Sequence, residues 1–141
     1  MYPSIIQVDV IIPTQTKYLD FIGSIGERIA KELDTYTGDK AALAYQLNLV
    51  LTEATANAIK HANDQNQQDI VRVSICLNEN VLNIKVYDKG QGFDLNSVPE
   101  PDFDNPKEGG MGLFFIRSTM DSVTYTKSDT ENVLEIIKNL N

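Results

Sequence analysis

Apolar and polar residues alternate along five short stretches of the chain, and this period of two is typical of strands that bury one face. A tight polar turn joins the second stretch to the third, and another joins the fourth to the fifth, so both pairs are predicted to form antiparallel hairpins. The first stretch ends at Pro13, which favours a strand at a sheet edge. The five stretches are residues 8–12, 71–77, 82–86, 123–127 and 133–138.

Three other segments carry apolar residues at the 3.6-residue period of a helix with one buried face. Two of them, residues 19–33 and 43–58, are separated by Gly38 and Asp39, and the third covers residues 112–120. The predicted order of elements is therefore βααββαββ. It indicates an α/β (α+β) two-layer sandwich, with a mixed, mostly antiparallel sheet and helices on one face. At 141 residues the whole chain, 1–141, is expected to be one domain.

The acidic composition narrows the classes of partner. The chain has 12 Lys plus Arg against 20 Asp plus Glu, a formal net charge of -8, so attraction to nucleic acid or to an anionic membrane is not expected. A basic protein partner would suit this charge, although the charge can equally serve solubility alone. One cysteine permits no internal disulfide, and no apolar run reaches membrane-spanning length, so a cytoplasmic location is expected.

A polar stripe on the second predicted helix supplies the first candidate chemistry. Glu53, Asn57 and His61 follow each other at i, i+4 spacing and so lie on one side of the helix, with Lys60 nearby. An amide oxygen is a ligand for Mg²⁺, a carboxylate can accept a proton from a hydroxyl group, and a cationic side chain can neutralise phosphate. Alone, the stripe is better explained as an ordinary solvated helix face.

Two glycine-containing segments supply further candidate chemistry. Asp88 follows a predicted strand and precedes Gly90 and Gly92, where a flat ligand can approach the backbone and an exocyclic amine can donate to the carboxylate. Gly109 to Gly112 precede an apolar helix, whose first N–H groups attract phosphate. The simpler alternatives are a plain turn and a hinge. The segment from Gly109 to Gly112 fits neither the P-loop nor the Rossmann glycine pattern of other nucleotide sites.

Together the three segments resemble the motifs of the GHKL, or Bergerat-fold, ATP-binding superfamily. Residues 51–62 look like its N box, 88–93 like its first glycine box and 109–113 like its second. A short chain with Glu in the N box most resembles the anti-sigma factor serine-protein kinases of the RsbW type, which have a histidine kinase-like ATPase domain.

That resemblance implies roles for individual residues. Asn57 would ligate Mg²⁺, Glu53 would be the catalytic general base toward a protein serine, and Asp88 would recognise the adenine of ATP. The remaining residues implied to bind the nucleotide are Lys60, His61, Gly90, Gly92, Phe93, Lys107, Gly109, Gly110, Met111, Gly112 and Leu113.

The resemblance also implies partners. The substrate would be a serine of an anti-anti-sigma (STAS) protein, the kinase would also sequester a sigma factor by partner switching, and it would act as a homodimer. Two features depart from the family pattern: Lys107 is the sole cation within residues 94–108, and the turn 128–132 lacks a glycine.

Other functions compete with this kinase. The first alternative is a regulatory module that binds a nucleotide and sequesters a protein partner without efficient phosphoryl transfer, which the acidic segment 94–108 favours. A histidine kinase catalytic domain usually has Asn in place of Glu53 and needs a separate phosphoacceptor helix. A gyrase-like ATPase couples hydrolysis to a further domain.

Overall fold

Five strands form one sheet in the computed structural model, which describes residues 5–34, 36–64, 70–89 and 110–140. The sheet order is β1-β2-β3-β5-β4, and each of the four neighbouring pairs is antiparallel. The parallel pairing that a mixed sheet would contain is therefore not found among the described strands. The strands are β1 (Ile5–Pro13), β2 (Ile70–Asn78), β3 (Val81–Asp88), β4 (Ser122–Thr126) and β5 (Asn132–Asn139).

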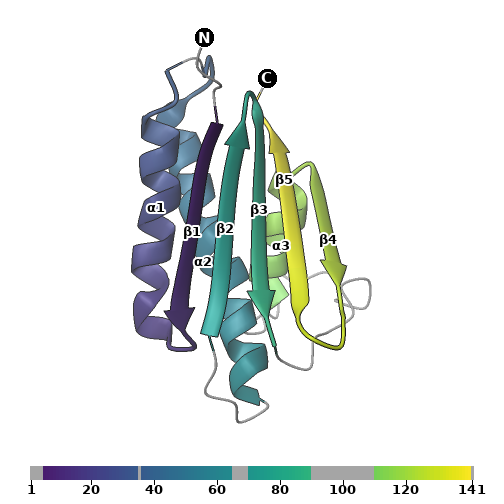
Figure 1. The fold of residues 1–141 in the computed structure, drawn as a ribbon. Helices are drawn as coiled ribbons and strands as arrows, with labels where there is room; N and C mark the ends of the chain where they lie inside the picture. Colours follow the sequence, from purple (N-terminus) through teal and green to yellow (C-terminus); the bar gives the residue numbers. More distant parts are fainter. Residues whose placement is uncertain (1–4, 35, 65–69, 90–109, 141) are drawn as a thin grey trace, which may run out of the picture.

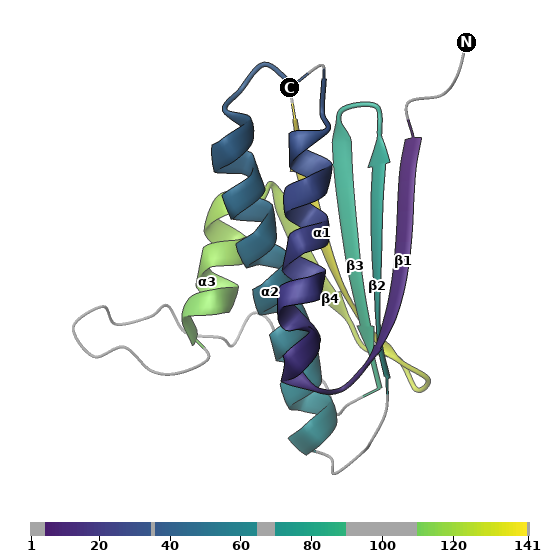
Figure 2. The same ribbon diagram turned by 90° about the vertical axis from the view of Figure 1, so that its left-hand side faces the viewer.

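The helices cover one face of this sheet (Figures 1 and 2). They are α1 (Leu19–Lys31), α2 (Lys40–Asp64) and α3 (Gly110–Thr119), and a short 3-10 helix, η1 (Thr16–Tyr18), leads into α1. Helices on one side of an antiparallel sheet are an α+β two-layer architecture, as the sequence predicts. No helix in these described ranges combines the length and the apolar character that a membrane crossing requires.

Alternation along the strands produces the two faces of the sheet. In β2, Val71, Val73, Ile75 and Leu77 are buried against the helices, while the residues between them are only half-buried on the other face. The helix layer contributes the matching apolar face of α2. Asp39 fixes where α2 begins, because its carboxylate accepts hydrogen bonds from the N–H groups of the first helical turn at 3.0 and 3.1 Å.

Helices α1 and α2 approach closely because α1 carries glycine at the contact. A Cβ added to Gly26 would lie 2.6 Å from Leu51 Cδ1 and 3.1 Å from the carbonyl carbon of Leu47. A Cβ added to Gly23 would lie 2.7 Å from the side chains of Asn48 and Thr52. This packing holds α2 firmly, and α2 is the helix that carries the predicted polar stripe.

Several elements begin earlier than the periodicity indicates, among them β1, α2 and α3. Strand β1 begins at Ile5 and not at Val8, because its ladder with β2 continues to the pair of Ile5 with Asn78. Helix α3 begins at Gly110 and not at Gly112. The first N–H groups of a helix have no partner within the helix, so glycine is tolerated there and the apolar period starts only afterwards.

Candidate functional site

The polar stripe of α2 exists as predicted. Glu53, Asn57 and His61 are half-buried, whereas Ala54 and Ala58 belong to the core face of the same helix. His61 Nε2 lies 3.2 Å from Asn57 Oδ1, within hydrogen-bond distance, so the ring and the carboxamide orient each other one turn apart. The stripe is therefore a polar surface in which the Asn57 amide oxygen lies between Glu53 and His61 along the helix.

The first turn of α3 lies against Glu53. A Cβ added to Gly112 would overlap Glu53 Oε2 and would stand 2.9 Å from Glu53 Cδ. Only glycine at this position leaves room for the carboxylate, so the close approach, and not a turn, explains this residue. The second glycine segment and the helical stripe, about 60 residues apart in the sequence, thus meet in one place.

Asp88 ends β3 as a buried carboxylate, 5% exposed, opposite Asn132, which is 3% exposed at the start of β5. Asn132 Nδ2 donates to Asp88 Oδ1 at 3.1 Å. Burial, and then the negative charge of Asp88, raise the pKa of the nearby Tyr125 phenol well above its ordinary value. A carboxylate can accept several hydrogen bonds at once, so one of them can come from an amine of a bound ligand.

The topology explains why these segments meet at one end of the molecule. In Figure 1, β3 ends, β5 begins and the first turn of α3 lies toward the same end of the sheet. A ligand that contacted both would donate a hydrogen bond to Asp88 and present an anionic group such as a phosphate to the first N–H groups of α3, since a helix N-terminus attracts anions.

The remaining predicted site residues divide into three groups. Leu113 is buried in α3, and Lys60 is exposed on α2 beside His61. Gly110 and Met111 belong to the first turn of α3. The residues that lie outside the described part of the chain are Gly90, Gly92, Phe93, Lys107 and Gly109.

Sequence reasoning missed Asn132 and Tyr125 as neighbours of Asp88. It assigned Asn132 to a turn that lacks glycine, although the residue begins β5 and its side chain turns to the buried face. The available signal was the position of Asn132 directly before the alternating run 133–138, because a strand often extends by one residue.

The oxygen ligands that Asn57 and Glu53 offer suit a magnesium ion that is shared with a nucleotide. Within the described ranges no three His, Cys, Asp or Glu side chains gather as a metal site. Mg²⁺ usually takes only one or two protein oxygens and fills its other positions with water and substrate phosphates, so the Asn57 carboxamide beside Glu53 suits it.

The chain belongs to the family described as the histidine kinase-like ATPase domain, which matches residues 24–138. It is similar to the serine-protein kinase RsbW of Oceanobacillus iheyensis, with 32% identity over 85 residues that cover 55% of this chain and 54% of that protein. It is also similar to RsbW of Staphylococcus aureus, with 34% identity over 88 residues, 56% of this chain and 55% of that protein. The chain thus spans about half the length of the curated relatives it matches.

A solved structure supports the fold. The histidine kinase domain of the blue-light activated histidine kinase from Erythrobacter litoralis EL346 superposes with a TM-score of 0.55 over 92% of this chain and 62% of that chain. The sequence identity is 20%, so this likeness concerns the fold alone. The family match and the names of the curated relatives confirm the resemblance on which the sequence interpretation rests.

Proposed function

We propose that this chain is an ATP-dependent serine-protein kinase that also acts as an anti-sigma factor. The observation that carries the proposal is the contact of the Glu53 carboxylate with Gly112 in the first turn of α3. It sets a potential base beside N–H groups suited to phosphate, with the Asn57 carboxamide one helical turn away. The family membership and the relatives named as serine-protein kinases support the same reading.

Each residue would have a defined task in the transfer. Asp88, oriented by Asn132, accepts a hydrogen bond from the adenine amine, and the α3 N–H groups bind phosphate oxygens. Mg²⁺, held by Asn57, would neutralise charge on the phosphates. Glu53 accepts the proton of the serine hydroxyl while the serine oxygen forms a bond to the γ-phosphorus. The bond between the γ-phosphorus and the oxygen that bridges to the β-phosphate breaks, so that ADP leaves with the electron pair.

The proposed protein substrate is an anti-anti-sigma (STAS) protein, and the proposed sequestered partner is a sigma factor. The kinase would work as a homodimer in the cytoplasm, as one domain that covers residues 1–141. Phosphorylation of the STAS protein would lower its affinity for the kinase, because a phosphoserine adds negative charge against a chain whose own net charge is -8. The sigma factor would then take its place.

The test is to incubate the protein with Mg·ATP and a STAS protein and to locate phosphoserine by mass spectrometry. Glu53→Gln should lower transfer by about 100-fold or more, the usual contribution of a general base, while calorimetry still shows nucleotide binding. Glu27→Gln is the matched control, because Glu27 is also a half-buried helical glutamate but accepts a hydrogen bond from Asn48 at 2.6 Å in the interface of α1 and α2. Full transfer by the Glu53→Gln protein would remove the base from the mechanism.

The same experiment separates the alternative function. A protein that binds ATP and a partner but never phosphorylates the STAS protein would be a nucleotide-dependent sequestering module. Asp88→Asn should weaken ATP binding by about 1.5–3 kcal/mol, the value of a hydrogen bond to a charged group, under either function. Unchanged ATP affinity after that substitution would exclude the adenine role of Asp88.

A further inference from the structure

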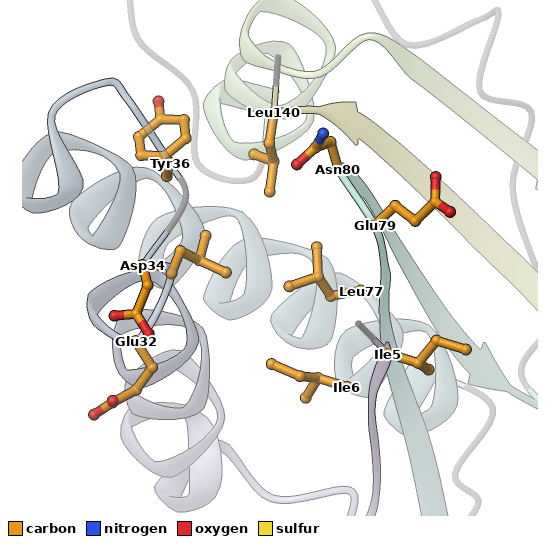
Figure 3. A pocket seen from close by; sticks show the side chains of 10 residues that line it. Ile5, Ile6, Glu32, Asp34, Tyr36, Leu77, Glu79, Asn80 and Leu140 are labelled. Atoms are coloured by element: carbon orange, nitrogen blue, oxygen red, sulfur yellow. The ribbon is translucent and has the colours of Figure 1, made fainter. Parts of the chain in front are cut away.

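A pocket lies at the end of the molecule opposite the candidate nucleotide site. Its volume is about 320 Å³, at the lower end of the range for small binding sites. Figure 3 shows Ile6, Leu77 and Leu140 directed toward its centre, and Leu33 of the α1 side completes the apolar floor. Leu33, Leu77 and Leu140 are buried, whereas Ile6 is 38% exposed at the rim. The pocket therefore offers space for an apolar side chain that enters from outside.

The rim of this pocket is acidic. Glu32 and Asp34 border it on the α1 side, Glu79 borders it at the β2–β3 turn, and none of the ten lining residues is basic. Arg28 pairs with Glu32 at 3.0 Å, but neither Asp34 nor Glu79 has an ion pair within the described residues. Opposite charges on a binding partner would therefore meet a complementary rim.

One of these acidic residues has a strained backbone conformation. Glu79 has φ of 57°, a left-handed value that favours glycine, at the first position of the two-residue turn between β2 and β3. The carbonyl of the next residue, Asn80, accepts a hydrogen bond from Leu140 N–H at 2.8 Å, which ties the turn to the pocket floor.

The edge of the sheet passes beside the pocket. Strand β1 pairs only with β2 in the described sheet, so the other edge of β1, which begins at Ile5 by the pocket, presents backbone N–H and C=O groups. An extended segment could pair with this edge and point alternate side chains toward the helices.

We propose that the pocket docks an extended segment of a protein partner that presents an apolar side chain flanked by Lys or Arg. The apolar side chain fills the space above Leu77, and the basic residues face Asp34 and Glu79. Because the pocket and the candidate nucleotide site lie at opposite ends of the sheet, the protein would bind the segment and a nucleotide at the same time. This proposal stands without phosphoryl transfer by the other site.

The test is selection from a displayed library of random 12-residue peptides on the intact protein, followed by measurement of peptide affinity by fluorescence anisotropy. The enriched peptides should share an apolar residue with Lys or Arg beside it. Ile6→Gln should weaken them at least tenfold, while Ile11→Gln, a change on the opposite face of β1, should leave affinity unchanged. ADP at saturation should not displace them.

Two double variants test how much the acidic rim contributes to peptide affinity. The double variant Asp34→Lys with Glu79→Lys should weaken binding of the enriched peptides at least tenfold. The double variant Asp20→Lys with Asp129→Lys changes the net charge by the same amount but lies outside the pocket lining, so it should leave their binding unchanged. Circular dichroism checks that every variant is folded. Enrichment of peptides without basic residues, equal binding by both double variants, displacement by ADP or the absence of any enriched peptide would overturn the proposal. A dimer in sedimentation that Ile6→Gln dissociates would overturn it as well, since a second copy would then fill the pocket.

Discussion

The contact between Gly112 and Glu53 gives the sharpest prediction about the candidate site. In Gly112→Ala, the new methyl carbon would stand 2.9 Å from Glu53 Cδ and 3.2 Å from Glu53 Cβ, and closer still to one carboxylate oxygen. Carbon atoms pack best at roughly 3.5–4.0 Å, so the carboxylate must rotate away. An off-rotamer side chain costs about 0.5–1.5 kcal/mol, while Ala stabilises a helix by about 1 kcal/mol relative to Gly.

These two terms nearly cancel, so the free energy of unfolding of Gly112→Ala should stay within about 1 kcal/mol of the original protein. Phosphoryl transfer should fall on the order of 100-fold, because a displacement of about 1 Å in a catalytic group has that effect. The assays are urea unfolding and single-turnover transfer of labelled phosphate to a STAS protein. Gly23→Ala is the control, because it crowds Asn48 and Thr52 by a similar amount away from the stripe and should keep full transfer.

A double-mutant cycle decides whether the loss acts through Glu53. In a Glu53→Gln background that retains residual transfer, Gly112→Ala should add little further loss, since the base is already absent. An equal loss in both backgrounds would show that the methyl group disturbs phosphate binding at α3 and not the carboxylate. Undiminished transfer by Gly112→Ala alone would refute the assignment of Glu53 as a positioned base.

Three further predictions concern stability, measured as urea midpoints. Gly26→Ala should destabilise the fold by about 1–3 kcal/mol, because its methyl group meets the backbone of Leu47, which cannot rotate away. Glu79→Gly should stabilise it by about 0.5–1 kcal/mol, since relief of a left-handed φ outweighs the added flexibility of glycine. The pKa of Tyr125 in the folded protein is raised above the ordinary 10.0, so the unfolded chain loses this proton first as pH rises. The contribution of Tyr125 to the free energy of unfolding is therefore complete below pH 10.0 and decreases above it. Tyr125→Phe should therefore lose less stability than the original protein between roughly pH 9 and pH 11; an identical loss would contradict the shift.

The helices, the strands and the polar stripe were predictable because each depends on residues close together in the sequence. Glu53, Asn57 and His61 share a helix, so the 3.6-residue period alone places them on one side. The burial of Val71, Val73 and their alternate neighbours in β2 follows from the period of two in the same way.

The pairs that build the site were not predictable in this way. Asn132 reaches Asp88 across 44 positions of sequence, and the pair depends on the register of β3 with β5. A slip by one residue would turn one side chain of each such pair to the opposite face of the sheet. The contact of Glu53 with Gly112 likewise depends on how α2 and α3 pack, which no local period specifies.

The antiparallel topology places the candidate nucleotide site and the acidic pocket at opposite ends of the sheet, although the residues of the two sites alternate along the sequence. Strand β3 ends and β5 begins at the candidate nucleotide site, whereas β1 begins, β2 turns into β3 and β5 ends at the acidic pocket (Figure 1). Helix α2 has 25 residues and, at about 1.5 Å per residue, a length of roughly 37 Å, enough to reach from one end toward the other. If a docked segment and a nucleotide change each other's affinity, the two changes must be equal, and α2 is the element through which packing can transmit them. Substitutions at Gly26, which holds α2 against α1, should therefore alter that coupling more than substitutions at Ile11 on the outer face of β1.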